Sequence, residues 1–284
     1  MRVYYGLVMV SVIMFGIQFL FNERYEKLSG NDAAATFAFV FLSSVSGLIC
    51  LLVINRFRLE WTPFTAVCAL AAALNSLLYT VCSMKALSRI NLSLYSLFAM
   101  LGGMLLPFLQ GLIFYDEVLT LGKIVCVVLI SAALFFSVSG TIGSHGLIFY
   151  IGVFVLNGMS GVITKLFESA PYLKTSAAGY SVLSTAMTVL ISGIILLLIK
   201  KQGVHIVKKA IVFAFCGGIL GRVTNFLLLL ALAVLPASTQ YPMVTGGVMV
   251  VSTVIALIIG QKPSKREVLS VALSFAGLLA LVIL

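Results

Sequence analysis

The sequence predicts an all-α integral membrane protein, with ten transmembrane helices arranged as two inverted five-helix repeats. Of its 284 residues, 62% are hydrophobic and 9% are charged, whereas a soluble globular domain is about half apolar and a quarter charged. The apolar residues occur in long blocks, and about 20 such residues cross a bilayer as a helix. A segment of the first half also recurs in the second half, which indicates an internal duplication.

The first five apolar blocks follow one another with short polar joins. The first block leads into FNERYEK without a small-residue cleavage site, so we expect a retained helix and not a signal peptide. The join at 87–92 is tight, which makes it one of two places where the count of helices depends on the boundary. The predicted helices of this half are 3–22, 34–55, 64–87, 92–114 and 121–138.

Five further blocks have the same length and composition. The eighth contains GILGRVTNFLLLL, an arginine within an apolar run, and the join that follows it at 234–238 is the second tight one. The joins are too short to hold a soluble domain. The predicted helices of this half are 146–167, 176–199, 210–234, 238–259 and 267–284.

Charge, cysteine and histidine positions exclude several other classes of protein. The net charge is +10, but most basic residues flank the apolar blocks, where they anchor helices at lipid headgroups, so no nucleic-acid partner is expected. The five cysteines lie apart within apolar blocks, and His145 and His205 lie in predicted loops. We therefore expect no disulfide framework, no metal site and no cofactor.

The duplication joins two segments at a constant offset of 144 residues. LFAMLGGMLLPFLQGLIFYDEVLT (97–120) aligns with YPMVTGGVMVVSTVIALIIGQKPS (241–264), so that Gly102 and Gly103 fall on Gly246 and Gly247. An odd number of helices in each copy places the second copy upside down in the membrane. The predicted repeats are 1–143 and 144–284, an arrangement typical of secondary transporters with a binding site between the halves.

The sequence FYDEVLT after the fourth block, together with ten helices in two repeats, resembles the EamA-type branch of the drug/metabolite transporter superfamily. Glu117 and Thr120 match the Glu and Thr of that family's motif, whereas Gly260–Gln261 keeps the Gly and replaces the acid. The resemblance implies a carrier in a bacterial plasma membrane, with a central cavity walled by helices 1, 3, 4, 6, 8 and 9. It also implies a cytoplasmic N-terminus, whereas the distribution of Lys and Arg among the loops favours an outside one.

Polar residues within the blocks recur at helical spacing, mainly in the helices that the resemblance places around the cavity. Residues three or four apart share a helix face. A polar side chain at this depth either lines a cavity or bridges two helices, and for the asparagines the two roles are equally weighted. The predicted substrate-binding residues are Gln18, Asn75, Tyr79, Tyr95, Asn157, Arg222, Asn225 and Tyr241.

Arg222 is the sharpest candidate because it lies in the middle of the eighth block. Each end of that block is about 18 Å away along the helix, beyond the reach of an arginine side chain. All eight acids lie in loops or at span ends, so the arginine must interact with backbone carbonyls, cavity water or a bound anion. Its planar guanidinium matches a carboxylate or phosphate. Lys165 and Lys85, by contrast, lie close enough to span ends for their stems to reach the interface.

The glycine pairs and two neighbouring prolines are candidate hinges. Pro interrupts the backbone ladder of a helix and lets it bend, although close helix packing would also use glycine pairs. The predicted gating residues are Gly102, Gly103, Pro107, Pro242, Gly246 and Gly247.

These observations favour a secondary transporter, exporter or exchanger, of a small polar metabolite that bears a carboxylate or phosphate. Alternating access would rock the two repeats about a midplane cavity. No P-loop is present to use ATP, and Asp116–Glu117 is the only acid pair, so we expect no enzyme activity. The alternatives are an exporter of hydrophobic or cationic drugs, which the absence of a mid-membrane acid disfavours, and a channel or scaffold subunit. The expected partners are the substrate and the lipid bilayer; a monomer suffices, and a homodimer is compatible.

Overall fold

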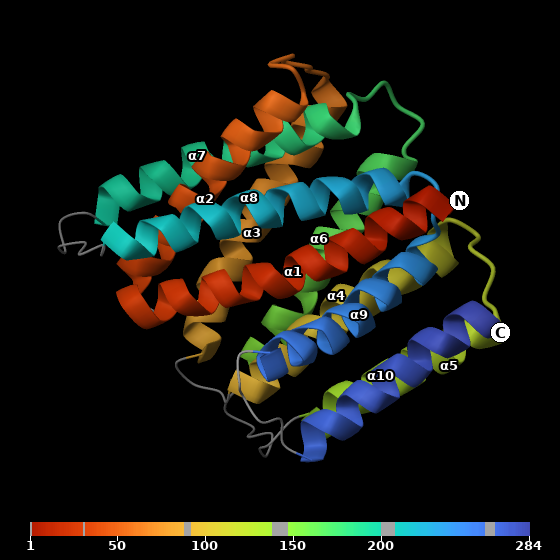
Figure 1. The fold of residues 1–284 in the computed structure, drawn as a ribbon. Helices are drawn as coiled ribbons and strands as arrows, with labels where there is room; N and C mark the ends of the chain where they lie inside the picture. The colour runs from red at the N-terminus through yellow and green to blue at the C-terminus, as the bar shows by residue number, and fades with distance from the viewer. Residues whose placement is uncertain (1, 31, 88–91, 138–146, 200–207, 259–264) are drawn as a thin grey trace.

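A computed structural model describes residues 2–30, 32–87, 92–137, 147–199, 208–258 and 265–284 (Figure 1). These residues form ten α-helices, as the sequence predicts, and no strand is found among them. The helices are α1 (Arg2–Ser29), α2 (Ala33–Ile54), α3 (Pro63–Leu87), α4 (Leu92–Phe114), α5 (Leu121–Ser137), α6 (Leu147–Ser169), α7 (Ala177–Ile199), α8 (Lys208–Leu232), α9 (Ala237–Ile258) and α10 (Lys265–Ile283).

The helix boundaries follow from capping residues in the sequence. Asp32 accepts a hydrogen bond from the Ala35 N–H (2.8 Å) and begins α2. Gly30 adopts a positive φ of 78° directly after α1, a conformation that glycine allows at no steric cost. The first helix therefore continues through the charged residues to Ser29, and the predicted end at residue 22 is wrong because charged residues also favour a helix until a glycine ends it.

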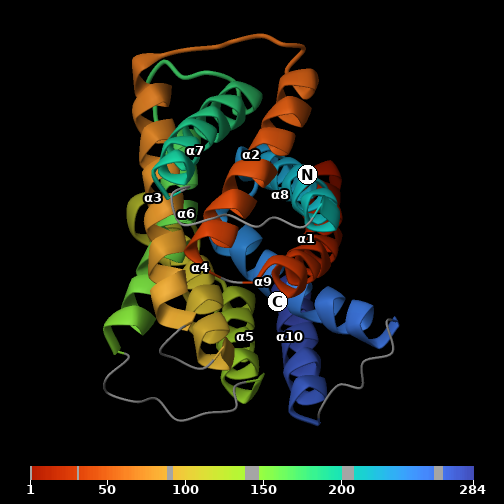
Figure 2. The ribbon, with the colours of Figure 1, turned by 90° about the vertical axis from the view of Figure 1, so that its left-hand side faces the viewer.

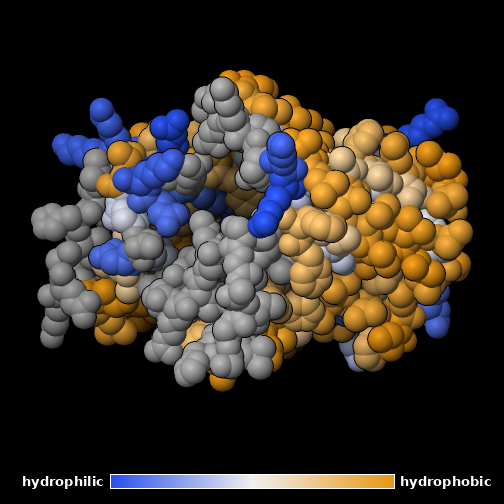
Figure 3. Space-filling view, turned by 90° about the horizontal axis from the view of Figure 1, so that it is seen from below, coloured by the Kyte–Doolittle hydropathy of each residue, from blue (hydrophilic) through white to orange (hydrophobic). Residues whose placement is uncertain are grey.

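The apolar character of the helices is consistent with a membrane-embedded protein. Six helices are long and apolar enough to cross a membrane, and α4, α5 and α10 contribute shorter apolar stretches. The remaining helix, α9, begins with Ser238, Thr239 and Gln240, which lower its mean hydropathy. In the space-filling view, hydrophobic side chains cover most of the right-hand part of the face shown, and hydrophilic side chains gather mainly on its left-hand part (Figure 3).

Eight helices pack in a closed ring, in the order α1, α8, α2, α7, α3, α6, α4 and α9, and α5 packs on α10, which also packs on α9. For description, the ring is divided into a first group (α1, α2, α8 and α9) and a second group (α3, α4, α6 and α7). In one group α8 packs along α1 and α2, and α1 also packs along α9; in the other, α3 packs along α6 and α7, and α6 also packs along α4. Seen along the helices, the two groups lie side by side, with α5 and α10 beneath them (Figure 2). The groups meet where α2 packs on α7 and where α4 packs on α9.

Candidate binding site

Arg222 lies on the face of α8 that packs against α2. Its Nη2 donates a hydrogen bond to the Ser44 Oγ (2.8 Å), and the Ser44 side chain is fully buried. A β-carbon built at Gly47 would overlap the Arg222 side chain, so only glycine at this position of α2 leaves room for the arginine. In the part of the chain that the structure describes, Arg222 has no acidic partner and remains half-buried.

Asn225 and Leu229 lie on nearly the same face of α8 as Arg222, because they follow it by three and seven residues. Leu229 packs against buried residues of α3, α6 and α7, which shows that this face is directed toward the second helix group. Asn225 donates to the Gly221 carbonyl (2.7 Å) one turn before it and stays exposed. Arg222 therefore lies half-buried against α2, and Asn225, on nearly the same face of α8, is exposed.

Gln18 of α1 lies beside the glycine-rich face of α8. A β-carbon built at Gly221 would lie 2.6 Å from the Gln18 Nε2, and one built at Gly217 would lie 3.1 Å from the Asn22 Oδ1. The Gln18 Oε1 and the Asn22 Oδ1 are both buried without a hydrogen-bond partner among the described atoms. Asn22 is not among the predicted residues, although its spacing of four from Gln18 places both on one face.

Two predicted asparagines bridge helices within the second group. The Asn75 Nδ2 donates to the Leu156 carbonyl (2.9 Å) and to the Ser160 Oγ (3.0 Å), which joins α3 to α6. The Asn157 Nδ2 donates to the Ala99 carbonyl (2.6 Å), which joins α6 to α4. These contacts use the amide groups for helix packing, which is one of the two roles weighed from the sequence.

Two predicted tyrosines have different surroundings. Tyr79 packs beside the buried pair Ala99 and Val153, between α3, α4 and α6. Tyr95 belongs to α4, but its side chain lies outside the described residues. The structure thus brings Arg222, Asn225 and Gln18 together around α8, whereas Asn75, Asn157 and Tyr79 lie among the helices of the second group.

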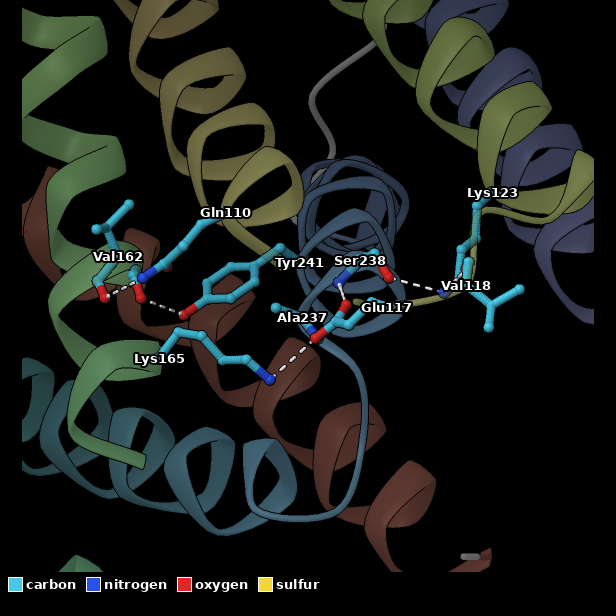
Figure 4. Close-up of polar contacts among 10 residues, drawn as sticks. Gln110, Glu117, Val118, Lys123, Val162, Lys165, Ala237, Ser238 and Tyr241 are labelled. Carbon is cyan, nitrogen blue, oxygen red and sulfur yellow. Dashed lines mark hydrogen bonds and ion pairs between the residues drawn. The ribbon is translucent and has the colours of Figure 1, made fainter. Parts of the chain in front are cut away.

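Tyr241 connects α9 to α6, whereas Asn75 and Asn157 connect α6 to α3 and α4. Its OH donates to the Gly161 carbonyl (3.1 Å), and the Gln110 Nε2 of α4 donates to the neighbouring Val162 carbonyl (3.2 Å). Figure 4 shows both bonds next to a charged cluster. Three helices that are distant in sequence therefore meet at one turn of α6.

The charged cluster is centred on Glu117, in the segment between α4 and α5. The Glu117 carboxylate lies 2.9 Å from the Lys165 Nζ, with the two side chains 8% and 9% exposed. It also accepts hydrogen bonds from the Ala237 and Ser238 N–H groups at the start of α9, both at 2.8 Å (Figure 4). Burial alone would raise the pKa of Glu117, but the hydrogen bonds from Ser238, Lys165 and Ala237 outweigh it and lower this pKa.

Sequence analysis did not identify this cluster. Lys165 turns inward to Glu117 and lies 5.1 Å from the centre of the Tyr115 ring, so the expectation that its stem extends to the interface is wrong. Lys123, also buried, donates to the Ser238 Oγ (2.7 Å) and to the Val118 carbonyl (2.6 Å). The available signal was the Asp116–Glu117 pair at the end of a predicted helix, but its partners lie more than 40 residues away in sequence.

The six predicted hinge residues lie in α4 and α9, and their glycines all contact neighbouring helices. A β-carbon at Gly102 would overlap the Phe154 carbonyl of α6, and one at Gly103 would lie 2.7 Å from the Asn157 Nδ2. Gly246 faces Ile130 of α5, and Gly247 faces Val12 of α1. Pro107 and Pro242 lie inside α4 and α9. The glycines thus allow close packing, and their hinge role stays a prediction.

The comparisons with known proteins concern the fold. No family model matches the chain, and no curated protein matches its sequence. Among solved structures, 29 chains match. One of them, described only as the crystal structure of a protein, superposes with a TM-score of 0.80 at 13% identity, covering 98% of this chain and 96% of the other. At this identity the likeness establishes a shared fold and nothing about activity.

Proposed function

We propose that the protein is a secondary carrier of a small polar metabolite that bears a carboxylate or phosphate. The substrate binds between the two helix groups, with Arg222 holding its anionic group and Gln18 and Asn225 bonding its polar remainder. Transport proceeds by alternating access between the two sides of a cell membrane, which the EamA-type resemblance identifies as a bacterial plasma membrane. No enzymatic step is part of this proposal.

The observation that carries the proposal is the state of Arg222. A charged side chain at membrane depth is costly and needs a partner or water. Its hydroxyl partner Ser44 is neutral, so the positive charge of the guanidinium is uncompensated in the described structure. An anion bound beside Arg222 would supply the missing charge in two-point geometry. The buried, unbonded Gln18 and Asn22 amide oxygens lie between α1 and the glycine face of α8, so polar groups without a partner among the described atoms also occur on the α1 side of this helix.

Paired glycine contacts support the inverted arrangement of repeats 1–143 and 144–284. Two contacts between α1 and α9 recur between α6 and α4, when α1 positions are advanced by 145 (16 to 161, 12 to 157) and α9 positions are reduced by 144 (251 to 107, 247 to 103). Such recurrence is expected for two copies related by a pseudo-two-fold axis. The matching contacts are Gly16–Val251 with Gly161–Pro107, and Gly247–Val12 with Gly103–Asn157.

The test is a panel of carboxylates, phosphates, neutral metabolites and lipophilic cations, read as thermal stabilisation of the purified protein and as uptake into liposomes. We expect anionic compounds to stabilise the wild type and Arg222→Met to weaken their binding by about tenfold or more, since a hydrogen bond to a charged group contributes about 1.5–3 kcal/mol. Arg58→Met removes an exposed arginine from the segment between α2 and α3 and serves as the matched control.

Two results would contradict the proposal. Equal binding of anions by the wild type and Arg222→Met would remove Arg222 from the site. Stabilisation by lipophilic cations alone would replace the anion carrier with a drug exporter. A scaffold subunit would show neither uptake nor any ligand-dependent difference between the two variants.

A further inference from the structure

Several polar contacts between helices lie at one end of the molecule. This end carries both chain termini and the joins 55–62, 115–120, 170–176 and 233–236 (Figure 1). Here Glu117, which follows α4, accepts two N–H groups from the start of α9, and Tyr241 of α9 bonds to the Gly161 carbonyl of α6. Both contacts join a helix of the first group, α9, to the group formed by α3, α4, α6 and α7.

A second set of polar contacts at this end joins the segments that precede α3 and α7, within the second group. Glu60, between α2 and α3, accepts hydrogen bonds from the Ser176 N–H (2.6 Å) and the Ser176 hydroxyl (2.8 Å), just before α7. Thr65 of α3 accepts the Thr175 N–H (3.1 Å) beside it. Hydrogen bonds therefore connect the α2–α3 segment and the start of α3 to the α6–α7 segment at this end of the molecule.

An aromatic cluster fills the space below these polar contacts. The Phe167 and Tyr180 rings stack with their centres 4.1 Å apart, and Phe167 is fully buried. Leu229 of α8 packs on both rings and is 2% exposed, together with Cys68 and Ala69 of α3. This cluster joins α8 of the first group to three helices of the second, and no water-sized passage is expected through such packing.

The candidate substrate residues lie directly behind this cluster. Asn225 is four residues before Leu229 on α8, about 6 Å along the helix axis. Asn225 is exposed and Leu229 is buried, so the space between the groups is closed between these two positions. The polar contacts of Glu117 and the aromatic cluster thus form two successive layers at one end of the proposed pathway.

We propose that Glu117 acts as the latch of a gate at this end. While its carboxylate binds the start of α9, the aromatic cluster is closed; when α9 is released, the cluster opens to water. The inference rests on the proposed carrier function and assigns the gate to residues of this chain. In the closed state the carboxylate holds the first backbone N–H groups of α9, which have no partner within the helix. Lys165 keeps the carboxylate charged and oriented from α6.

The lysines make the latch reversible. When α9 moves away from Glu117, the carboxylate keeps its ion pair with the Lys165 ammonium. It does not become an unpaired buried charge, which would destabilise the open state strongly. Lys123 loses the Ser238 hydroxyl but keeps the Val118 carbonyl. Opening therefore breaks the two bonds from the α9 N–H groups to Glu117, the Lys123–Ser238 bond and the Tyr241–Gly161 bond, while the Glu117–Lys165 ion pair remains intact.

The test measures whether the aromatic cluster opens when the latch is weakened. The five native cysteines are replaced, a single cysteine is introduced as Leu229→Cys, and the protein is placed in lipid nanodiscs with a water-soluble maleimide. We expect slow labelling with Glu117 present and labelling at least about tenfold faster in Glu117→Gln, since each lost charge-assisted hydrogen bond shifts the opening equilibrium by that order.

Two controls keep the result specific. Glu26→Gln removes an exposed acid near the end of α1, away from Glu117 and the aromatic cluster, and we expect it to leave the labelling rate unchanged. Met104→Cys, at a fully buried position of α4 facing α5, reports on general loosening of the fold and should stay protected in every background.

An unchanged rate in Glu117→Gln would overturn the latch, and so would an equal increase at Met104→Cys, which would make Glu117 a stabiliser of the whole fold. The labelling uses no substrate, so it is independent of the Arg222 panel. Anion binding that depends on Arg222 together with unchanged labelling would remove the latch alone. Faster labelling together with anion binding that ignores Arg222 would remove the proposed site alone.

Discussion

Single glycines determine how closely the helices of this protein approach one another. A β-carbon at Gly102 would overlap the Phe154 carbonyl of α6, a backbone atom that cannot rotate away. Gly158 of α6 is fitted in the same way against the Gly102 carbonyl, at 2.5 Å for its built β-carbon. Small residues at a crossing are the usual means by which membrane helices gain packing contacts, because lipid provides no hydrophobic drive between helices.

We therefore expect Gly102→Ala to lower the free energy of unfolding by about 1–3 kcal/mol, the usual cost of overpacking. The matched control is Gly6→Ala, because a β-carbon there meets nothing within 4 Å. In a helix that exchange is neutral or stabilising by up to about 1 kcal/mol. Thermal unfolding in detergent checks both variants, and equal midpoints for the two would contradict the packing role of Gly102.

Residue-scale predictions from the sequence succeed where one side chain is unusual by itself. The position of Arg222 within a helix, without an acid beside it, follows from the linear distribution of charges. The environment of Asn75 does not, because donating to Leu156 or lining a cavity depends on how α3 is rotated relative to α6. Rotation about a helix axis is set by all packed neighbours together and is not encoded in the spacing of one polar residue.

At the scale of the elements, the start of α9 is held by a titrating group, Glu117. Its first N–H groups are held by Glu117, whose pKa is lowered by hydrogen bonds from Ser238, Lys165 and Ala237 in excess of the opposing effect of burial. A carboxylate with a lowered pKa stabilises the fold above its unfolded pKa, about 4.3, and that contribution is lost as pH falls through the folded pKa.

We expect the wild type to lose thermal stability more steeply than Glu117→Gln as pH falls below about 4, because the glutamine has no proton to bind. Lys123 and Tyr241 also face this carboxylate, but lysine and tyrosine ordinarily titrate near pH 10 and do not change charge in that range. Melting curves of both proteins from pH 7 to pH 3.5 test this. Parallel curves would show that the carboxylate adds no pH-dependent stability.

At the scale of the whole molecule, the packing groups differ from the two repeats that the sequence predicts. Each four-helix group takes two helices from each repeat: α1 and α2 with α8 and α9, and α3 and α4 with α6 and α7. Packed groups move as rigid bodies more readily than chain segments that are separated in space. The latch at Glu117 and the aromatic cluster both lie between these groups, so we expect the groups, and not the repeats, to move during transport.

Spin-label pairs distinguish these two motions. Leu166 of α6 and Val234, directly after α8, lie in the same predicted repeat but on different groups. Leu166 and Ile113 of α4 lie in different predicted repeats but in one group. All three side chains are exposed. In Glu117→Gln we expect the Leu166–Val234 distance distribution to broaden toward longer values and the Leu166–Ile113 distribution to stay constant, as measured by double electron–electron resonance. The reverse pattern would show that the repeats move as units.

Composition and periodicity were sufficient to predict ten helices and the apolar character of the bundle, because lipid solvent imposes a fixed length and an apolar surface on every spanning helix. The same linear information identified Arg222 as a charge without a partner. It did not reveal the Glu117–Lys165 pair, whose members are 48 residues apart (117 and 165), or the interhelical bonds of Asn75 and Asn157.

Only the tertiary structure decided those contacts, and it also decided that α8 packs with α1 and α2 while α3 packs with α6 and α7. The physical reason is that the sequence of a membrane helix fixes which of its residues are polar, whereas the partner of each polar residue is fixed by which helix crosses it and at what depth. In this protein the glycines set those crossings, and the crossings place Glu117 at the start of α9 and place Arg222 against α2, beside Ser44 and Gly47.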